Sequence, residues 1–277
     1  MKKVIIQLKD VCYSTSKETI NFGAIESADI LFDISLKIYK NEILGICGES
    51  GGGKTTLIKL LAGIIKPVSG EMKVDHNITP TNNRPSRIQI LFQNNADLLN
   101  PYRKVKAVVT EAIKLSKTKN DIVNKEKEKL FHMLGIQSDI ENRRGNELSG
   151  GERQKVALAR LLAVKPSVLI LDEPFSAQDV ISQLNFLKVL KRINNELNLT
   201  IICISHDLSM LKKLAHRVIV LQKGRIVESA DTSKLFNSPD HPYTKFLLRA
   251  EEYSLTKEEI QSYNSEDKQQ EPDQSKQ

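Results

Sequence analysis

Apolar residues along this chain either alternate with polar ones or gather in short runs, two patterns that are typical of β-strands. Ile34, Leu36 and Ile38 are separated by polar residues and predict a half-buried strand. Residues 4–11 alternate only partly, which indicates an edge strand. Short, mainly apolar stretches predict strands over residues 42–47, 88–92 and 218–221, and buried strands over residues 168–172 and 200–205.

Between these strands, apolar residues recur at helical spacing. Leu57, Leu60, Leu61 and Ile64 predict a helix over residues 53–62, and Gly63 falls where a helix can end. The same spacing predicts helices over residues 151–164, 180–195 and 208–215. Strands that alternate with helices are typical of an α/β fold with a mostly parallel sheet.

Three stretches depart from this alternation. Residues 94–147 carry periodic apolar positions among many Asn, Lys and Glu, so we expect an inserted, mainly helical subdomain over about 94–164. Residues 14–30 predict a hairpin or loop, and Lys223-Gly224 predicts a tight turn between two strands. From residue 251 the chain is polar and charged, so we expect a domain of residues 1–250 followed by a disordered tail over 251–277.

Composition narrows the class of protein. The 277 residues are 40% hydrophobic, and 41 Lys+Arg against 34 Asp+Glu give a net charge of +7, which fits a solvated surface or a nearby polyanion or membrane. No apolar stretch approaches the roughly 20 residues of a membrane-spanning helix. Cys12, Cys47 and Cys203 have no metal-binding or redox spacing, so we expect buried thiols in a reducing cytoplasm.

The segment GESGGGKT at residues 48–55 follows a predicted strand and opens a predicted helix, which is the context of a phosphate-binding loop (P-loop). Glycines let backbone N–H groups surround a phosphate, and the helix N-terminus adds partial positive charge. The Lys54 ammonium can reach the β and γ phosphates, and the Thr55 hydroxyl can bind Mg²⁺. The residues expected to bind a nucleoside triphosphate are Gly48, Glu49, Ser50, Gly51, Gly52, Gly53, Lys54, Thr55 and Thr56.

Two carboxylates follow one another at the end of the predicted strand over 168–172. Asp172 could hold Mg²⁺ through water, and Glu173 could act as a general base that directs a water at the γ-phosphate. By themselves they could equally be solvated residues at a strand end. Next to a phosphate-binding loop, the catalytic interpretation is favoured.

A second glycine-containing helix start lies in LSGGERQ at residues 148–154. Ser149, Gly150 and Gly151 could form a further anion site, or Ser149 could simply cap the helix. One domain does not need two γ-phosphate sites for one nucleotide. A second subunit could use this site, because it could cover a nucleotide held in its partner's loop.

The phosphate-binding loop, LSGGERQ and LILDEP, in this order, resemble the ATPase subunit of ATP-binding cassette (ABC) transporters over residues 1 to about 250. The resemblance implies a P-loop NTPase fold with a mixed, mostly parallel sheet, an N-terminal antiparallel β subdomain and the helical insertion. It also implies ATP and Mg²⁺ as cofactors, and two cassettes that enclose two ATP molecules between them.

The resemblance implies roles for three further positions. Gln93, which closes the strand ILFQ, is similar to the Q-loop glutamine, which contacts Mg²⁺ and senses the transmembrane partner. His206 is similar to the switch histidine that contacts the γ-phosphate. Residues 176–179, SAQD, resemble the D-loop, with Gln178 where Leu is usual.

Two other segments resemble the oligopeptide, dipeptide and nickel importer ATPases. LNPY at 99–102 is similar to their SLNPR segment, and GRIVE at 224–228 followed by HPYTK at 241–245 is similar to their C-terminal signature. The resemblance implies an ATPase on the cytoplasmic face of the membrane that powers uptake of peptides, nickel or metal chelates. Its partners would be two permease subunits, a second ATPase subunit (a sister chain or a copy) and, indirectly, a substrate-binding protein, with no nucleic acid.

One position departs from the family pattern. The adenine-stacking aromatic normally lies four residues after the Val of the first strand, and counting from Val11 leads to Thr15. Tyr13 or Phe22 could replace it, and we expect Tyr13. Because Thr15 and Gln178 are unusual, a degenerate regulatory cassette remains an alternative, as does the ATPase of another class of ABC transporter.

Overall fold

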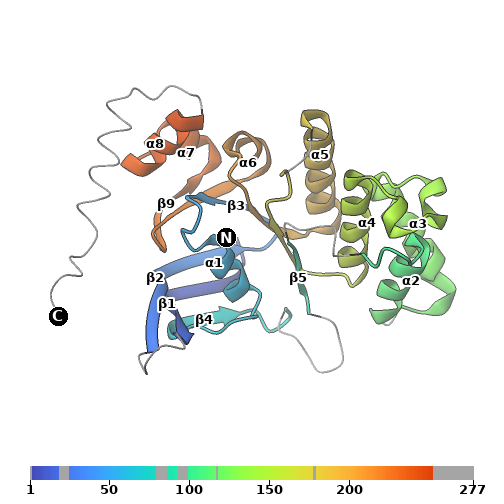
Figure 1. The fold of residues 1–277 in the computed structure, drawn as a ribbon, viewed down its shortest axis with the longest axis horizontal. Helices are drawn as coiled ribbons and strands as arrows, with labels where there is room; N and C mark the ends of the chain where they lie inside the picture. Colours follow the sequence, from blue (N-terminus) through green and yellow to red (C-terminus); the bar gives the residue numbers. More distant parts are fainter. Residues whose placement is uncertain are drawn as a thin grey trace.

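The computed structural model describes residues 2–18, 25–78, 86–92, 99–116, 118–176 and 179–251. At its centre is a six-stranded sheet in the order β5-β6-β7-β3-β8-β9, in which the last strand is antiparallel and the others are parallel (Figure 1). The strands are β3 (Ile43–Gly48), β5 (Ile88–Leu91), β6 (Val168–Asp172), β7 (Thr200–Ile204), β8 (Arg217–Gln222) and β9 (Arg225–Asp231). The predicted mostly parallel α/β sheet is confirmed.

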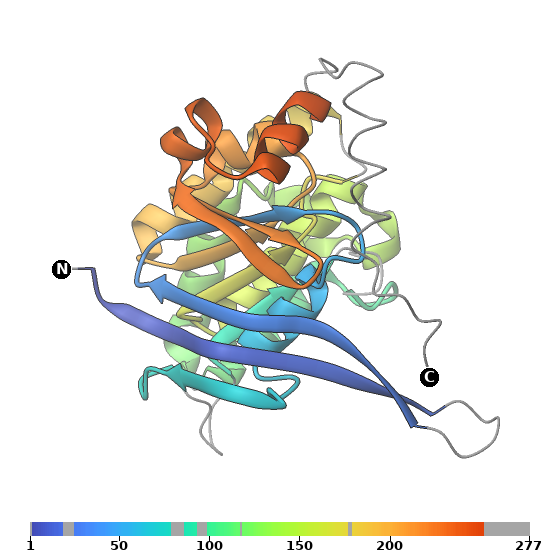
Figure 2. The same ribbon diagram turned by 90° about the vertical axis from the view of Figure 1, so that its left-hand side faces the viewer.

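A second, antiparallel sheet forms a separate layer across the first (Figure 2). It contains β1 (Val4–Glu18), β2 (Ile25–Tyr39) and β4 (Ser69–Val74) in the order β2-β1-β4. The prediction of an edge strand at 4–11 is wrong, because Leu8 pairs with Leu36 on one side and with Met72 on the other. The strand β4 escaped prediction because its sequence, SGEMKV, is mostly exposed and lacks an apolar pattern.

The central strands are buried on both faces, which explains their unbroken apolar runs. In β3, Leu44 and Ile46 pack toward the antiparallel sheet and helix α1 (Lys54–Leu61), whereas Ile43 and Cys47 belong to the core on the opposite face. Cys47 and Cys203 are buried free thiols, as predicted, whereas Cys12 is only partly buried.

Three helices form a group at one end of the molecule, beyond α5 (Figure 1). They are α2 (Val105–Leu115), α3 (Val123–Leu134) and α4 (Gly150–Ala163), with short 3-10 helices at Asn120–Ile122, Ser138–Asn142 and Gly145–Glu147. They confirm that the insertion is helical. After α4 the chain returns to the central sheet, where α5 (Val180–Leu197) follows β6 and α6 (Leu208–Leu214) follows β7.

The C-terminal helices α7 (Thr232–Asn237) and α8 (Pro242–Glu251) were not predicted. The turn at Lys223-Gly224 was predicted correctly, and both residues have positive φ, 45° and 72°. The β1 and β2 strands confirm a hairpin within residues 14–30, although residues 19–24, including Phe22, lie outside the described residues. The tail prediction falls almost wholly on residues 252–277, also outside them. None of the described helices is long and apolar enough to span a bilayer.

Candidate functional site

The loop between β3 and α1 has a backbone course that glycine permits. Gly48 has a φ of 139°, and a Cβ atom there would lie 1.9 Å from the carbonyl oxygen of Leu221. Gly53 has a φ of 93°, and a Cβ there would lie 2.8 Å from the Leu31 side chain. The close approach of these neighbours therefore excludes larger residues at both ends of the loop.

Lys54 lies with its ammonium group inside this loop. Its Nζ atom donates hydrogen bonds to the carbonyl oxygens of Gly48, at 2.9 Å, and Glu49, at 2.6 Å. Burial lowers the pKa of Lys54. Since burial disfavours the charged form, an anion in the loop would be bound all the more readily by this ammonium.

The start of α1 has no side-chain cap. Gly53 occupies the N-cap position, and no side chain accepts from the first-turn amides. Ser50, Gly51 and Thr55 are exposed around this helix end, and a Cβ atom on Gly51 would meet nothing within 4 Å. The unsatisfied amides and the helix dipole thus make an anion site, with hydroxyl groups at its edge.

The turn between β8 and β9 supports this loop from outside, a contact that the sequence did not predict. The Lys223 amide donates to Oε1 of Glu49 at 2.8 Å, and the Gly224 amide donates to the Gly52 carbonyl at 3.3 Å. A turn was predicted at these residues, but its contact spans more than 170 positions of sequence. No local pattern carries such a contact.

Asp172 and Glu173 lie at the carboxyl end of β6, as predicted. The Asp172 side chain is largely buried; burial and the neighbouring Glu173 carboxylate raise its pKa. Glu173 has a φ of 51°, which is unusual for a residue other than glycine, and precedes Pro174. Such backbone strain costs on the order of 1–3 kcal/mol and is typical of functional sites.

Adjacent strands bring Glu173 and His206 together. β6 pairs with β7, and the Glu173 amide donates to the carbonyl of Ile204 at 3.0 Å. Oε2 of Glu173 lies 2.8 Å from Nδ1 of His206 and accepts from the His206 amide at 3.3 Å. A cavity of about 230 Å³ lies beside the His206 side chain, between α5 and the loops after β6 and β7.

Ser149 caps α4 in a reciprocal capping box with Glu152. Its hydroxyl accepts from the Glu152 amide at 3.3 Å, and the Glu152 carboxylate accepts from the Ser149 amide at 2.7 Å, which lowers the pKa of Glu152. A Cβ atom on Gly150 or Gly151 would meet nothing within 4 Å. Packing against the described residues therefore gives no reason for either glycine.

The LSGGERQ segment and the phosphate-binding loop belong to different parts of the domain. The α4 helix packs on α2 and α3, whereas α1 packs on β2 and β3. One side chain links α4 to the acidic pair: the buried Gln154 donates through Nε2 to the carbonyl of Pro174 at 2.7 Å. The sequence pattern predicted no role for Gln154.

The remaining predicted site residues have different outcomes. Gln93 and Gln178 lie outside the described residues. Tyr13 is half-buried and pairs across the strands with Leu31, which approaches Gly53 of the loop. Thr56 lies in the first turn of α1 and is partly buried. Tyr13 thus lies one strand away from the phosphate-binding loop.

The oxygen atoms at this site suit a hard cation. A carboxylate from Asp172 and a hydroxyl from Thr55 are ligand types that Mg²⁺ prefers, and the Asp172 carboxylate is largely buried beside the carboxylate of Glu173. Within the part of the chain that the structure describes, no three His, Cys, Asp or Glu residues gather as a metal-binding group. The donor set therefore fits Mg²⁺ bound partly by water and phosphate.

The two halves of the C-terminal segment similar to importer ATPases contact each other. The Glu228 carboxylate, whose residue is 8% exposed, accepts from the backbone amides of Asp240 at 2.9 Å and His241 at 3.1 Å. GRIVE and HPYT are thus one structural unit. The segment LNPY adjoins a cavity of about 350 Å³ lined by Asn100 and Arg103, among others, and Tyr102 beside it is 75% exposed.

Comparisons with known proteins show which family the chain resembles. The model of the family described as ABC transporter matches residues 31–176. The oligopeptide transport ATP-binding protein OppF of Bacillus subtilis is 37% identical over 238 residues, covering 82% of this chain and 77% of the relative. The dipeptide transport ATP-binding protein DppF of Haemophilus influenzae is 35% identical and covers 83% of this chain and 72% of the relative.

Solved structures of similar fold are ATP-binding cassettes. The structure of cbiO1 from Clostridium perfringens, part of the ABC transporter complex cbiONQ, has a TM-score of 0.74 at 25% identity and covers 95% of this chain and 100% of that one. A dimeric post-hydrolysis structure of the cassette MJ0796 with ADP and Pi has a TM-score of 0.68 at 25% identity, and covers 82% and 99% respectively.

Proposed function

The chain belongs to the ABC transporter family, and we propose that it is the ATP-hydrolysing subunit of an importer for peptides. The proposed ATPase activity rests on two features of the same domain: a phosphate-binding loop that holds the Lys54 ammonium, and the contact between Glu173 and His206. The importer class rests on the OppF and DppF relatives and on the GRIVE–HPYT unit held by Glu228.

In this proposal the loop at 48–53 and the uncapped start of α1 bind the phosphates of ATP. Lys54 exchanges its two carbonyl partners for oxygens of the β and γ phosphates. Thr55, Asp172 and Gln93 would hold Mg²⁺, which would neutralise part of the phosphate charge. Tyr13 stacks on the adenine, on the strand next to the one that contacts Gly53.

Glu173 is the proposed general base. One of its oxygens is held by His206, through Nδ1 and the backbone amide, which leaves the other oxygen to accept a proton from water. His206 also contacts the γ-phosphate, so that the orientation of the base depends on the presence of the nucleotide. The Glu173 amide donates to the Ile204 carbonyl, and this bond holds the backbone in its strained conformation at the end of β6. The carboxylate therefore stays at the strand end.

The proposed catalytic unit is a dimer of cassettes. Ser149, Gly150 and Gly151 lie apart from the phosphate loop of their own chain and would cover the nucleotide of a partner. ATP then favours the closed dimer, because only that state uses both halves of the site. Gln154 links α4 to Pro174, the residue after Glu173. When α4 covers the partner's nucleotide, this link would therefore transmit the change to the Glu173 that acts on the chain's own nucleotide.

The proposed location is the cytoplasmic face of a membrane, where the chain docks on two permease subunits. The cavity beside LNPY, between β5 and the helical group, is the proposed docking site. The exposed Tyr102 and the Arg103–Glu111 ion pair at its rim would contact the permease. A substrate-binding protein and the permeases select the cargo, so this chain determines the energy supply and not the cargo.

Uptake measured in cells tests the proposal. The only gene copy would encode Glu173→Gln, and a matched strain would carry Glu128→Gln, an exposed residue of α3. We expect loss of growth on a short peptide as the source of a required amino acid, with radioactive nickel accumulation unchanged. Loss of nickel uptake alone would assign a metal or metal-chelate importer, and no change in either would reject the importer assignment.

A further inference from the structure

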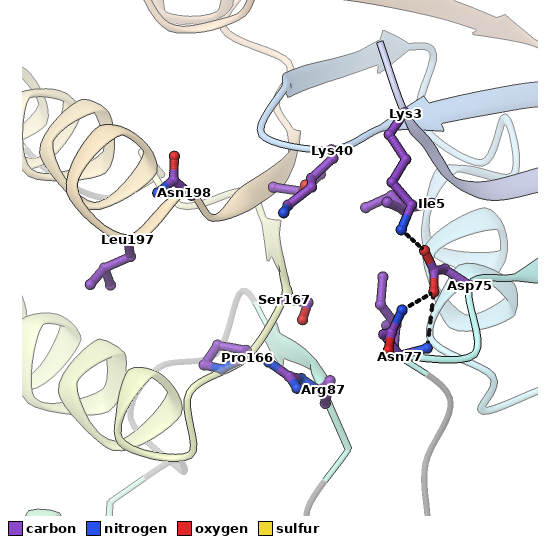
Figure 3. A pocket seen from close by; sticks show the side chains of 12 residues that line it. Lys3, Ile5, Lys40, Asp75, Asn77, Arg87, Pro166, Ser167, Leu197 and Asn198 are labelled. Atoms are coloured by element: carbon purple, nitrogen blue, oxygen red, sulfur yellow. Dashed lines mark hydrogen bonds and ion pairs between the residues drawn. The ribbon is translucent and has the colours of Figure 1, made fainter. Parts of the chain in front are cut away.

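A second cavity lies away from the phosphate loop, at the amino ends of the parallel strands. It has a volume of about 310 Å³, within the range of small-molecule sites. Its walls come from three parts of the fold: the antiparallel sheet, the starts of β6 and β7, and the end of α5 (Figure 3). The catalytic residues described above all lie at the opposite, carboxyl ends of these strands.

Hydrogen-bond donors dominate the free groups of this cavity. Lys40 and Arg87 line it on either side of Ser167 (Figure 3). The side chains of Lys40, Arg87 and Ser167 have no hydrogen-bond or ion-pair partner among the described residues. A backbone bond from the Lys40 amide to the Lys3 carbonyl, at 2.8 Å, fixes the turn that carries Lys40.

The carboxylate in the cavity is already engaged. Asp75 forms an ion pair with Lys3 at 2.6 Å and accepts from the backbone and side-chain amides of Asn77, both at 2.9 Å (Figure 3). These contacts hold the pKa of Asp75 well below its usual range. Asp75 therefore neutralises Lys3, and the charges of Lys40 and Arg87 are left uncompensated within the described part of the chain.

Charge balance in the cavity favours an anion with two negative charges. The carboxyl end of α5 contributes a partial negative charge of about half an elementary charge at this wall. That is smaller than the two full positive charges of Lys40 and Arg87. Both residues are exposed to solvent at the cavity, and a dianion between them would be attracted by both charges. Ser167 adds a neutral donor for a third oxygen.

We propose that this cavity is a second ligand site, which binds a small phosphate-bearing metabolite between Lys40 and Arg87. Phosphate fits the charge and offers several acceptor oxygens, and guanidinium and ammonium groups are its usual partners. Because the walls belong to three parts of the fold, the ligand would brace the antiparallel sheet against β6 and α5. Such a site would tune the cassette from the face opposite its nucleotide.

The test is calorimetric titration of the full chain with inorganic phosphate. Mg²⁺ and a non-hydrolysable ATP analogue at saturation keep phosphate out of the P-loop. We expect saturable binding that Lys40→Gln and Arg87→Gln each weaken by about tenfold or more, since each removes one charge-assisted contact. Lys125→Gln, which removes an exposed cation of α3, should leave binding unchanged.

Melting temperatures of the three variants establish that each is folded. Absence of saturable phosphate binding to the parent chain would overturn the proposal, as would equal weakening by Lys125→Gln, which would indicate a general charge effect. A lipid headgroup offers the same chemistry. Sedimentation with phosphatidic acid vesicles that depends on Arg87, without binding of phosphate or glycerol phosphate, would overturn the metabolite site in favour of a membrane contact.

Discussion

Oε2 of Glu173 lies 2.8 Å from Nδ1 of His206, although 33 positions separate the two residues in the sequence. The contact exists because β6 and β7 are neighbours and both residues follow the carboxyl ends of their strands. Glu173 is largely buried and His206 is 71% exposed at its side chain. The base is thus held from the solvent side by an exposed residue.

This contact predicts that Glu173 and His206 act as one unit in hydrolysis. Glu173→Gln and His206→Ala should each lower kcat by roughly 10²–10⁴-fold, as expected for loss of general base catalysis. The double variant should be about as slow as the slower single variant, since the second change removes a group that has already lost its function. Phosphate release under saturating MgATP measures this, and multiplicative losses would contradict it.

The same variant should reveal the dimer. With the γ-phosphate left intact, Glu173→Gln should stay closed on ATP, because the closed state alone uses Ser149 and its two glycines. Light scattering should show that ATP doubles the mass of the particle. If the partner is a sister cassette, the mass should double only when both chains and ATP are present. A chain that remains monomeric with either would count against the shared site.

Gly151→Ala separates folding from function. A Cβ atom there would meet none of the described residues within 4 Å, and alanine is favoured over glycine inside a helix by roughly 0.5–1 kcal/mol. We expect the free energy of unfolding in urea to be equal or slightly higher. ATPase activity, measured at a protein concentration at which the parent chain is dimeric, should fall clearly. Unchanged activity would mean that no nucleotide approaches this helix start.

Asp172→Asn should stabilise the chain in the absence of nucleotide and Mg²⁺. The folded-state pKa of Asp172 is raised above 3.8 by burial and by Glu173, so the ionised form destabilises the fold above that raised pKa. The gain in melting temperature should be present at neutral pH and should vanish as the pH falls below 3.8, where Asp172 is protonated in both states. MgATP binding should weaken in the same variant, which a fluorescent nucleotide titration measures.

Gly224→Ala tests the support that the β8–β9 turn gives to the phosphate loop, with Gly63→Ala as its matched control. Both glycines have a φ of 72°, so alanine costs each on the order of 1–2 kcal/mol. A Cβ atom at Gly63 meets nothing, whereas at Gly224 it would lie 2.2 Å from the Ile30 carbonyl. Nucleotide affinity should fall in Gly224→Ala alone; an equal fall in both would indicate general destabilisation.

Local patterns predicted much of this fold because its central strands are buried on both faces. Apolar runs such as the one at Val168–Asp172 therefore stand out without knowledge of their neighbours. The phosphate loop was equally visible, because the backbone geometry of Gly48 and Gly53 and the ammonium group of Lys54 belong to eight consecutive residues. The strand β4 was missed because it pairs through its backbone while its side chains face solvent.

Contacts between distant segments were beyond the sequence. Nothing local to Glu49 indicates that its carboxylate accepts from the Lys223 amide, or that Gln154 reaches the carbonyl of Pro174. The cavity with Lys40 and Arg87 is similarly assembled from residues that look like ordinary surface cations. Their shared space exists only once the antiparallel sheet has packed on the starts of the parallel strands.

The bonds that Glu228 accepts come from the backbone of Asp240 and His241, not from their side chains. Point substitutions at 240 or 241, except those to proline, therefore keep both donors, whereas inserting or deleting a residue between β9 and α8 would shift the amides away from a buried carboxylate. A change in the length of this connection should therefore disturb the joint more than the replacement of the Asp240 side chain.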